Sequence, residues 1–218
     1  MSMSANGVYR DASLVGEVIE SSTTAVLAQA CQLDAAPAFG SFVRVSGGDG
    51  GVSGSQSVYA VVANVQTAGI DPGARAVMRG HGDVRDDLIY RENPDLPLVL
   101  RTTFRCALVG FEAGASVHQL LPPTPPRLHY SVYVATAAEV RRFTDAGLDY
   151  LRTLLGTAEA ATDEMLAANI RLTGQLRGEP EAFTRAAGRE LADLLRADYP
   201  RLTGILRRCL SPLPLGEA

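Results

Sequence analysis

The stretch Ser57-Val-Tyr-Ala-Val-Val-Ala-Asn-Val65 is apolar on both faces that an extended strand would present. One face carries Tyr59, Val61, Ala63 and Val65, and the other carries Val58, Ala60 and Val62. A strand with one solvent-exposed face carries polar residues on that face. This strand is therefore expected to be packed on both sides, or to pack against a partner.

A second strand is predicted from Leu98 to Val109, where apolar and polar residues alternate. Its apolar face carries Leu98, Leu100, Phe104, Cys106 and Leu108. Arg101, Thr103 and Arg105 share the other face. The pattern predicts a half-buried strand with an arginine-bearing outer face.

Further strands are predicted at Leu14–Glu20, Ala25–Leu33 and Gly40–Val45. Residues 46–57 are rich in glycine and serine and are expected to form a loop. Several short strands without intervening helices favour a small closed barrel or a sandwich.

The second half of the chain has a helical pattern. The run Pro122-Pro-Thr-Pro-Pro126 is a candidate domain boundary, followed by one more strand at Leu128–Ala135. Thr136 and Glu139 then have the spacing of a capping box. A helical stripe follows, made of Val140, Phe143, Gly147, Leu151, Leu154 and Leu155.

Three further helices are expected near 163–176, 181–197 and 201–210. Pro180 and Pro200 stand at helix-starting positions, where a missing N–H costs nothing. The sequence therefore predicts an α+β protein. A small six-stranded β-barrel domain would occupy residues 8–127, and a strand plus a helical bundle would occupy residues 128–218.

Composition excludes several classes of protein. Hydrophobic residues make up 46% of the chain and charged residues 20%, which is enough to bury a core and argues against a disordered tail. The net charge of −4 has the wrong sign for a dedicated nucleic-acid domain. All 20 basic residues are arginine, so the lysine of a Walker-type P-loop is missing.

The expected location is the cytoplasm. No apolar run is long enough to span a bilayer, and residues 1–10 lack the apolar core of a secretory signal. Cys31, Cys106 and Cys209 are too widely spaced for a disulfide framework or a zinc site, so reduced thiols are expected.

Candidate chemical groups are few. Glu17 and Glu20 are three residues apart, which on a regular strand places them on opposite faces and argues against an acid/base pair. His81, Asp83 and Asp87 could form a metal site, although their charged stretch, 75–95, is better interpreted as a solvated loop. His118 and His129 are isolated and are interpreted as structural residues at the ends of strands. No catalytic residue, cofactor site or metal site is assigned.

The arginine-bearing face of the strand at 98–109 suggests a second hypothesis for the function. Arg101 and Arg105, with Arg44 and Tyr59 on other strands, could form a strip for single-stranded nucleic acid. The acidic balance and the lack of stacking aromatics argue against this function. The alternative is a polar outer face or a protein interface.

One segment of the sequence resembles a known protein family. Gly16-Glu-Val-Ile-Glu-Ser-Ser-Thr23 and the strand that continues to Leu33 resemble the opening of the HAS-barrel, which is shared by HerA-type DNA-translocating ATPases and rotary ATP synthase subunits. Pro37–Val43, Tyr59–Val62 and Thr103–Gly110 are similar to later parts of that barrel. The resemblance covers roughly residues 10–125. The proline-rich segment and the strand after it resemble stand-alone bacterial members that carry a helical extension.

The resemblance implies a six-stranded barrel that helps to hold the subunits of a ring-shaped ATPase together. The motor core of that family is absent here, so no catalytic residue is carried over. The chain is therefore expected to be a non-catalytic assembly or adaptor protein, which self-associates or docks on a separately encoded HerA- or FtsK-like ATPase. The expected interface consists of Gly16, Glu17, Val18, Glu20, Tyr59, Val61 and Val65. A single-stranded nucleic-acid-binding barrel using Arg101 and Arg105 is the alternative.

Overall fold

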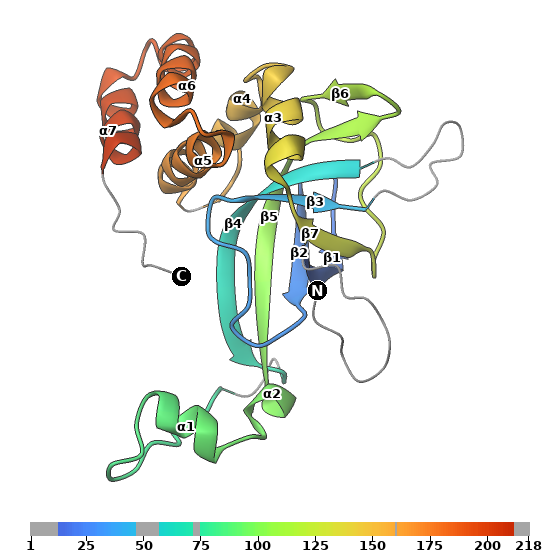
Figure 1. The fold of residues 1–218 in the computed structure, drawn as a ribbon, viewed down its shortest axis with the longest axis vertical. Helices are drawn as coiled ribbons and strands as arrows, with labels where there is room; N and C mark the ends of the chain where they lie inside the picture. The colour runs from blue at the N-terminus through green and yellow to red at the C-terminus, as the bar shows by residue number, and fades with distance from the viewer. Residues whose placement is uncertain (1–12, 47–56, 72–74, 160, 212–218) are drawn as a thin grey trace.

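The computed structural model describes residues 13–46, 57–71, 75–159 and 161–211. Its strands are β1 (Leu14–Ser21), β2 (Ala25–Ala30), β3 (Phe42–Val45), β4 (Ser57–Gly69), β5 (Leu100–Ala113), β6 (Ser116–His118) and β7 (Ser131–Val134). Its helices are α1 (Asp87–Glu92), α2 (Leu96–Val99), α3 (Ala137–Asp145), α4 (Tyr150–Leu155), α5 (Thr162–Arg177), α6 (Pro180–Leu194) and α7 (Tyr199–Leu210). The predicted α+β class and the helical C-terminal part are confirmed (Figure 1).

The strands form one antiparallel sheet whose pairing closes into a ring. The sheet order is β2-β1-β7-β3-β4-β5-β6, and an additional pairing of β2 with β5 closes it. β6 lies outside the ring and, among the described strands, pairs only with β5. β7 pairs with both β1 and β3, so the sheet continues past the proline-rich segment, and the change from strands to helices comes at Thr136.

The inside of the ring is filled by small and aromatic side chains. Its fully or almost fully buried members include Val18, Val26, Ala28, Val43, Val58, Ala60, Val62, Phe104, Cys106, Leu108 and Val132. Gly16 makes this packing possible, because a Cβ there would stand 2.5 Å from the carbonyl oxygen of Gln29 and 2.9 Å from the Phe104 ring. Any larger residue at position 16 would push β1 away from its neighbours.

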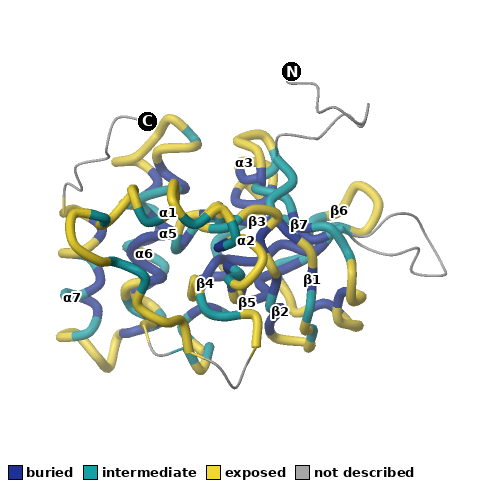
Figure 2. Tube along the Cα trace, turned by 90° about the horizontal axis from the view of Figure 1, so that it is seen from below, coloured by how far each residue is buried: buried dark blue, intermediate teal, exposed yellow. Residues whose placement is uncertain are grey.

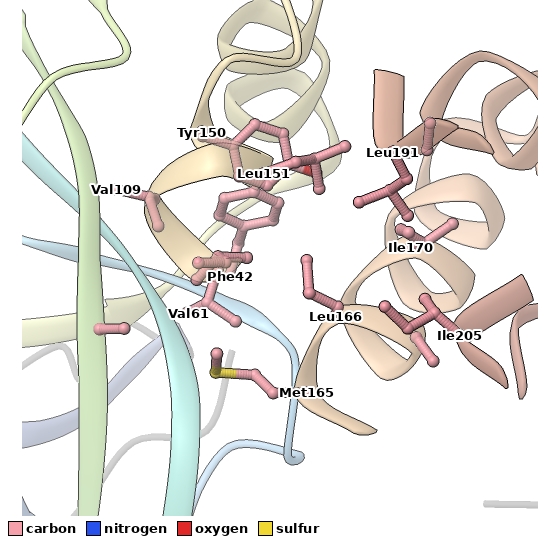
Figure 3. Close-up of a cluster of buried hydrophobic side chains, with 14 of the residues drawn as sticks. Phe42, Val61, Val109, Tyr150, Leu151, Met165, Leu166, Ile170, Leu191 and Ile205 are labelled. Carbon is pink, nitrogen blue, oxygen red and sulfur yellow. The ribbon is translucent and has the colours of Figure 1, made fainter. Parts of the chain in front are cut away.

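The outer face of β4 and β5 is covered by helices at one end. Val61 and Val109 belong to a second core with α3–α7 (Figure 3). Tyr59 is a member of the same core. The ring centroids of Tyr59 and Phe143 are 4.8 Å apart. This approach requires Gly110, where a Cβ would stand 2.7 Å from the Phe143 ring. The two-sided apolar pattern of β4 is thus accounted for by two layers of the same chain.

A buried amide joins the helices to the ring. Asn169 on α5 donates from Nδ2 to the carbonyl oxygen of Gly40 at 3.0 Å, and its Oδ1 accepts from Tyr150 Oη at 3.0 Å. Gly40 has φ +84° and lies against α5, where a Cβ would stand 2.5 Å from Ala168 Cβ. The loop before β3 is therefore held to α5 by packing and by a hydrogen bond.

The helix signals in the sequence are confirmed where they were strongest. Thr136 and Glu139 form a complete capping box at the start of α3. Pro180 and Pro200 stand in the first turns of α6 and α7. Within the part of the chain that the structure describes, no helix has the length and apolar character needed to cross a membrane.

The structure differs from the sequence prediction between β4 and β5. The sequence predicts a loop over residues 75–95, but these residues include the short helix α1. It also predicts Leu98 on the apolar face of a strand, but Leu98 lies in α2, and β5 begins at Leu100. The predicted loop at 46–57 falls, except for its first and last residues, outside the described residues.

Candidate interaction surface

The residues expected at an interface fall into two groups. Gly16, Val18, Tyr59 and Val61 are buried inside the chain, the first two in the ring interior and the last two beneath the helices. They are therefore absent from the surface of this fold. Glu17, Glu20 and Val65 are exposed and remain available for contact.

A β-bulge changes the geometry of the two glutamates. Glu17 pairs with Gln29 and Glu20 pairs with Leu27, with a register shift between Val18 and Glu20. Gln29 and Leu27 are two residues apart and share a face, so both glutamates lie on the outer face. The expectation that they occupy opposite faces is wrong, because it assumed a regular strand.

A second bulge moves Val65. The register of β4 against β5 shifts between Val62 and Asn64, after which Val65 pairs with Phe104. Phe104 belongs to the ring interior, so Val65 lies on that side of the sheet and not on the side of Tyr59 and Val61. Val65 is 40% exposed because the ribbon extends beyond the ring at this point.

The outer face beyond the helices is polar. Arg105 pairs across the sheet with Leu27 and Asn64, and Thr103 pairs with Gln29 and Gln66. The arginine-bearing outer face predicted for β5 is therefore present, and it extends onto β1 through the two glutamates. Arg105 Nε lies 2.8 Å from Glu159 Oε1, so its charge is offset by a carboxylate of the same chain. The face is mixed in charge and not a uniformly basic strip.

The candidate metal residues do not converge. Among the described residues, no group of three His, Cys, Asp or Glu side chains is placed to hold a metal ion. His81 is exposed, with Nδ1 3.2 Å from the carbonyl oxygen of Arg79. His129 lies 2.6 Å from Glu17 Oε1 on the surface, and His118 stacks on Phe111 at the end of β5.

The three cysteines have different environments. Cys31 is exposed, whereas Cys106 and Cys209 are buried. Burial raises the pKa of the Cys106 thiol in the ring interior. Burial likewise raises the pKa of Cys209 on α7 to about 11. Both thiols therefore stay protonated near neutral pH and are poor nucleophiles.

Among the described residues, the most exposed large apolar side chains lie on a segment for which the sequence predicts a charged loop. Residues 75–99, called the arm below, connect β4 to β5 and project from the end of that ribbon (Figure 1). Leu96 is the one buried side chain in its two helices. The tube of α1 contains no buried residue, whereas α5 has many (Figure 2).

A few polar contacts hold the arm in its conformation. Arg79 Nη1 donates to Asn93 Oδ1 at 3.0 Å and forms an ion pair with Asp95 at 2.9 Å. Tyr90 Oη donates to Asp34 Oδ2 at 3.2 Å, which ties α1 to the loop after β2. The charge of Asp34 raises the pKa of Tyr90, so the phenol stays a hydrogen-bond donor through the neutral range.

The arm presents an open apolar groove of about 680 Å³ where it meets the ends of β4 and β5. Its walls include Val77, Met78, Ile89, Leu96, Leu98 and Val99. A cavity of this size could hold a small molecule. However, Val77 is 81% exposed, Met78 91% and Leu98 77%, so the walls themselves face water. Exposed apolar walls of this kind fit a contact with another macromolecule better than an enclosed ligand site.

Sequence reasoning missed the arm for an identifiable reason. Val77 and Met78 stand inside a stretch dominated by arginine and aspartate, so the stretch was classed by its charges. Leu98 fitted the alternation of the following strand and was assigned to the core. Comparison with known proteins adds no further assignment, because no protein-family model matches the chain and no curated protein aligns with it.

Proposed function

We propose that this chain is a non-catalytic assembly or adaptor protein of the cytoplasm, which self-associates or docks on a separately encoded ring ATPase of the HerA or FtsK type. The proposal takes the closed ring of β1, β2, β5, β4, β3 and β7 to be a six-stranded barrel of the HAS type. The observation that carries the proposal is the exposed apolar surface of the arm, where Val77, Met78, Leu98 and Val99 line one open groove, since large contiguous apolar patches are uncommon on monomers.

The ring interior supports a structural role for the barrel. Phe104, Cys106 and Leu108 are fully buried there, packed against the side chains of neighbouring strands. A small barrel filled by its own side chains offers its outside and its loops for contact. Glu17, Glu20 and Val65 are the members of the original interface set that this surface retains.

The experiment is an affinity pull-down of the tagged chain from its native cells, analysed by mass spectrometry together with the native mass of the purified protein. Recovery of a RecA- or FtsK-like ATPase, or a native mass above that of the monomer, is the expected result. A monomeric native mass with no ATPase recovered would overturn the proposal.

The alternative function, binding of single-stranded nucleic acid, uses the polar outer face with Arg101 and Arg105. The row of guanidinium and amide donors favours it, and the carboxylates of Glu17, Glu20 and Glu159 on or beside the same face oppose it. Fluorescence anisotropy with a labelled single strand tests it directly. Affinity that falls steeply as salt is raised would favour this function over assembly.

A further inference from the structure

β4 has an open edge where it extends beyond the ring. Up to Val62 this edge is paired, since Val62 N donates to the carbonyl oxygen of Ser41 at 3.0 Å and the Val62 carbonyl oxygen accepts from Gly40 N at 2.8 Å. On its other side, β4 continues to pair with β5 as far as Gly69. Among the described residues, no strand pairs with residues 64–69 on the side away from β5, and Figure 1 shows this part of β4 at the border of the sheet.

The pairing with β5 determines which main-chain groups face outward. Ile70 N donates to the carbonyl oxygen of Val99, so Ile70 directs its main-chain groups toward β5. Residues 64–69 pair with β5 without a further register shift, and in an antiparallel pair alternate residues direct their main-chain groups to opposite sides. The residues that present an N–H and a carbonyl at the open edge are therefore Val65, Thr67 and Gly69. Such a row of unpaired groups is a template for one more strand.

The open edge is protected neither by charge nor by proline. Exposed strand edges are commonly blocked by charged side chains or by proline. The edge segment Asn64-Val-Gln-Thr-Ala-Gly69 contains neither. Its first four residues, 64–67, are exposed. An extended peptide can therefore add to the sheet as a further strand without any rearrangement of β4.

The outer face beside the open edge offers an unpaired cation. Arg101 pairs across the ladder with Ala68. Its guanidinium has no carboxylate partner among the described residues, whereas Arg105 pairs with Glu159. Because the side chain of Ala68 is small, the long side chain of Arg101 can extend over it toward an added strand. A carboxylate opposite Ala68 on that strand would then lie within reach of Arg101.

The inner face beside the open edge offers an apolar contact. Val65 pairs with the buried Phe104 and is 40% exposed. The one carboxylate bonded to this face, Asp34, accepts from Thr67 Oγ1 at 2.8 Å and from Tyr90 Oη at 3.2 Å. An apolar side chain opposite Val65 would cover it. A strand that is acidic on one face and apolar on the other therefore fits both sides of the edge.

The same edge of a second copy does not supply these groups. Residues 64–69 include no acidic residue, so in any register they offer Arg101 no carboxylate. In the antiparallel pairing that is symmetric about Thr67, Val65 would face Gly69 of the second copy and stay uncovered. The chemistry of the edge therefore selects an acidic segment of a different sequence.

We propose that the open edge of β4, residues 64–69, binds an extended segment of the partner protein as an added strand, with apolar side chains on the side of Val65 and a carboxylate beside Arg101. The proposal rests on the assembly function above and names the chemistry of the segment that the partner supplies. Main-chain hydrogen bonds to the edge provide affinity, and the alternation of apolar and acidic side chains provides selectivity.

Fluorescence anisotropy of the full chain with short labelled peptides is the measurement. In one peptide valine and glutamate alternate, and in the other, of the same length, valine and arginine alternate. We expect the Val–Glu peptide to bind and the Val–Arg peptide to bind about tenfold more weakly or worse.

Two variants test the main-chain contact and the charge separately. Val65→Pro removes an outward N–H and leaves the ladder with β5 intact, because proline is tolerated on an edge strand where the N–H faces solvent. Val65→Thr is the matched control, since it keeps the N–H and a β-branched side chain. Arg101→Glu reverses the charge, and Arg127→Glu makes the same change at an exposed position before β7. Circular dichroism and thermal unfolding verify the fold of each variant.

Val65→Pro is expected to weaken binding of the Val–Glu peptide about tenfold or more, and Val65→Thr by less than about threefold. Arg101→Glu is expected to prefer the Val–Arg peptide, whereas Arg127→Glu keeps the preference of the wild type. If Val65→Pro does not fold, the reversal in Arg101→Glu decides the matter. The proposal is refuted if the wild type does not bind the Val–Glu peptide at about 1 mM, or if it binds both peptides equally.

The outcomes also separate the open edge from other occupants and from the assembly function. If the wild type forms dimers that Val65→Pro abolishes, a second copy occupies the edge and the proposal is wrong. It is equally wrong if a labelled single-stranded oligonucleotide binds through Arg101 and the peptides do not bind. If the peptides fail while the pull-down recovers an ATPase, the edge contact is refuted and the assembly function stands. If the peptides bind as expected while the pull-down recovers no ATPase and the native mass is monomeric, the edge site stands and the assembly function fails.

Discussion

The two ends of the β4–β5 ribbon carry apolar side chains that differ in burial. At one end, Tyr59, Val61 and Val109 are fully buried beneath α3–α7. At the other end, Val77 and Met78 on the arm are almost fully exposed. The residue types are similar. Their burial differs because a second layer of the chain covers the first set and not the second. An apolar pattern therefore predicts burial only where the rest of the chain supplies that layer.

The helix-covered end should depend most on its aromatic cluster. Phe143→Ala removes a ring that contacts Tyr59, Phe42 and Tyr150, so we expect the free energy of unfolding to fall by about 3–5 kcal/mol. Urea denaturation followed by circular dichroism measures this change. A loss below about 1 kcal/mol would show that the helices do not form a common core with the ring.

The buried amide between helices and ring should have the next largest effect. Asn169→Ala leaves the Gly40 carbonyl and the Tyr150 hydroxyl without their partner, and we expect a loss of about 1–3 kcal/mol. Asn64→Ala on the exposed part of β4 serves as the control, with an expected change within about 0.5 kcal/mol. If the two variants lose equal free energy of unfolding, the hydrogen bonds of Asn169 do not hold the helices to the ring.

Alkaline pH should weaken both cores, because Cys106 lies in the ring interior and Cys209 lies in the core beneath the helices. Burial raises the pKa of Cys106 and Cys209, whereas in the unfolded chain both thiols deprotonate near pH 8.5. Their contribution to stability is therefore complete below about pH 8.5 and is lost as pH rises further, by about 1 kcal/mol per thiol at pH 9.5. Denaturation curves at pH 7.5 and 9.5 measure the loss. Cys106→Ala should reduce it, and an unchanged pH dependence in that variant would contradict the assignment.

The arm should have the smallest effect on stability. Met78→Gln replaces an exposed apolar side chain by a polar one of similar length, and we expect the free energy of unfolding to change by less than about 0.5 kcal/mol. Leu151→Gln, the same chemical change in the buried cluster, should prevent stable folding. Thermal unfolding of the two variants measures both changes. A large loss of stability in Met78→Gln would mean that the arm packs on its own chain.

Much of this architecture could be read from local patterns. The capping box of Thr136 and Glu139, the prolines that open α6 and α7, and the two-sided apolar pattern of β4 each act within a few residues, so the sequence displays them directly. The bulges after Val18 and after Val62, which set the faces of Glu20 and Val65, could not be read in this way. One extra residue in a strand reverses the faces of everything that follows it, and only pairing with the neighbouring strand reveals it.

The candidate surface was less accessible to sequence reasoning. Whether Tyr59 is an interface residue or a core residue depends on helices that begin more than seventy positions later in the chain. Met78 is exposed for the complementary reason, because no later element in the described part of the chain returns to cover it. Both outcomes are set by long-range packing, which periodicity within one segment does not encode.

The closure of the ring has a consequence for synthesis on the ribosome. β1 is the first strand to emerge, yet one of its edges pairs with β7, the last strand of the sheet. That edge stays open until residues 131–134 have left the exit tunnel, several seconds later at ordinary rates of elongation. From the emergence of β1 to that of β7, the nascent chain thus carries an unpaired strand edge, which is a template for pairing with other chains until the ring closes.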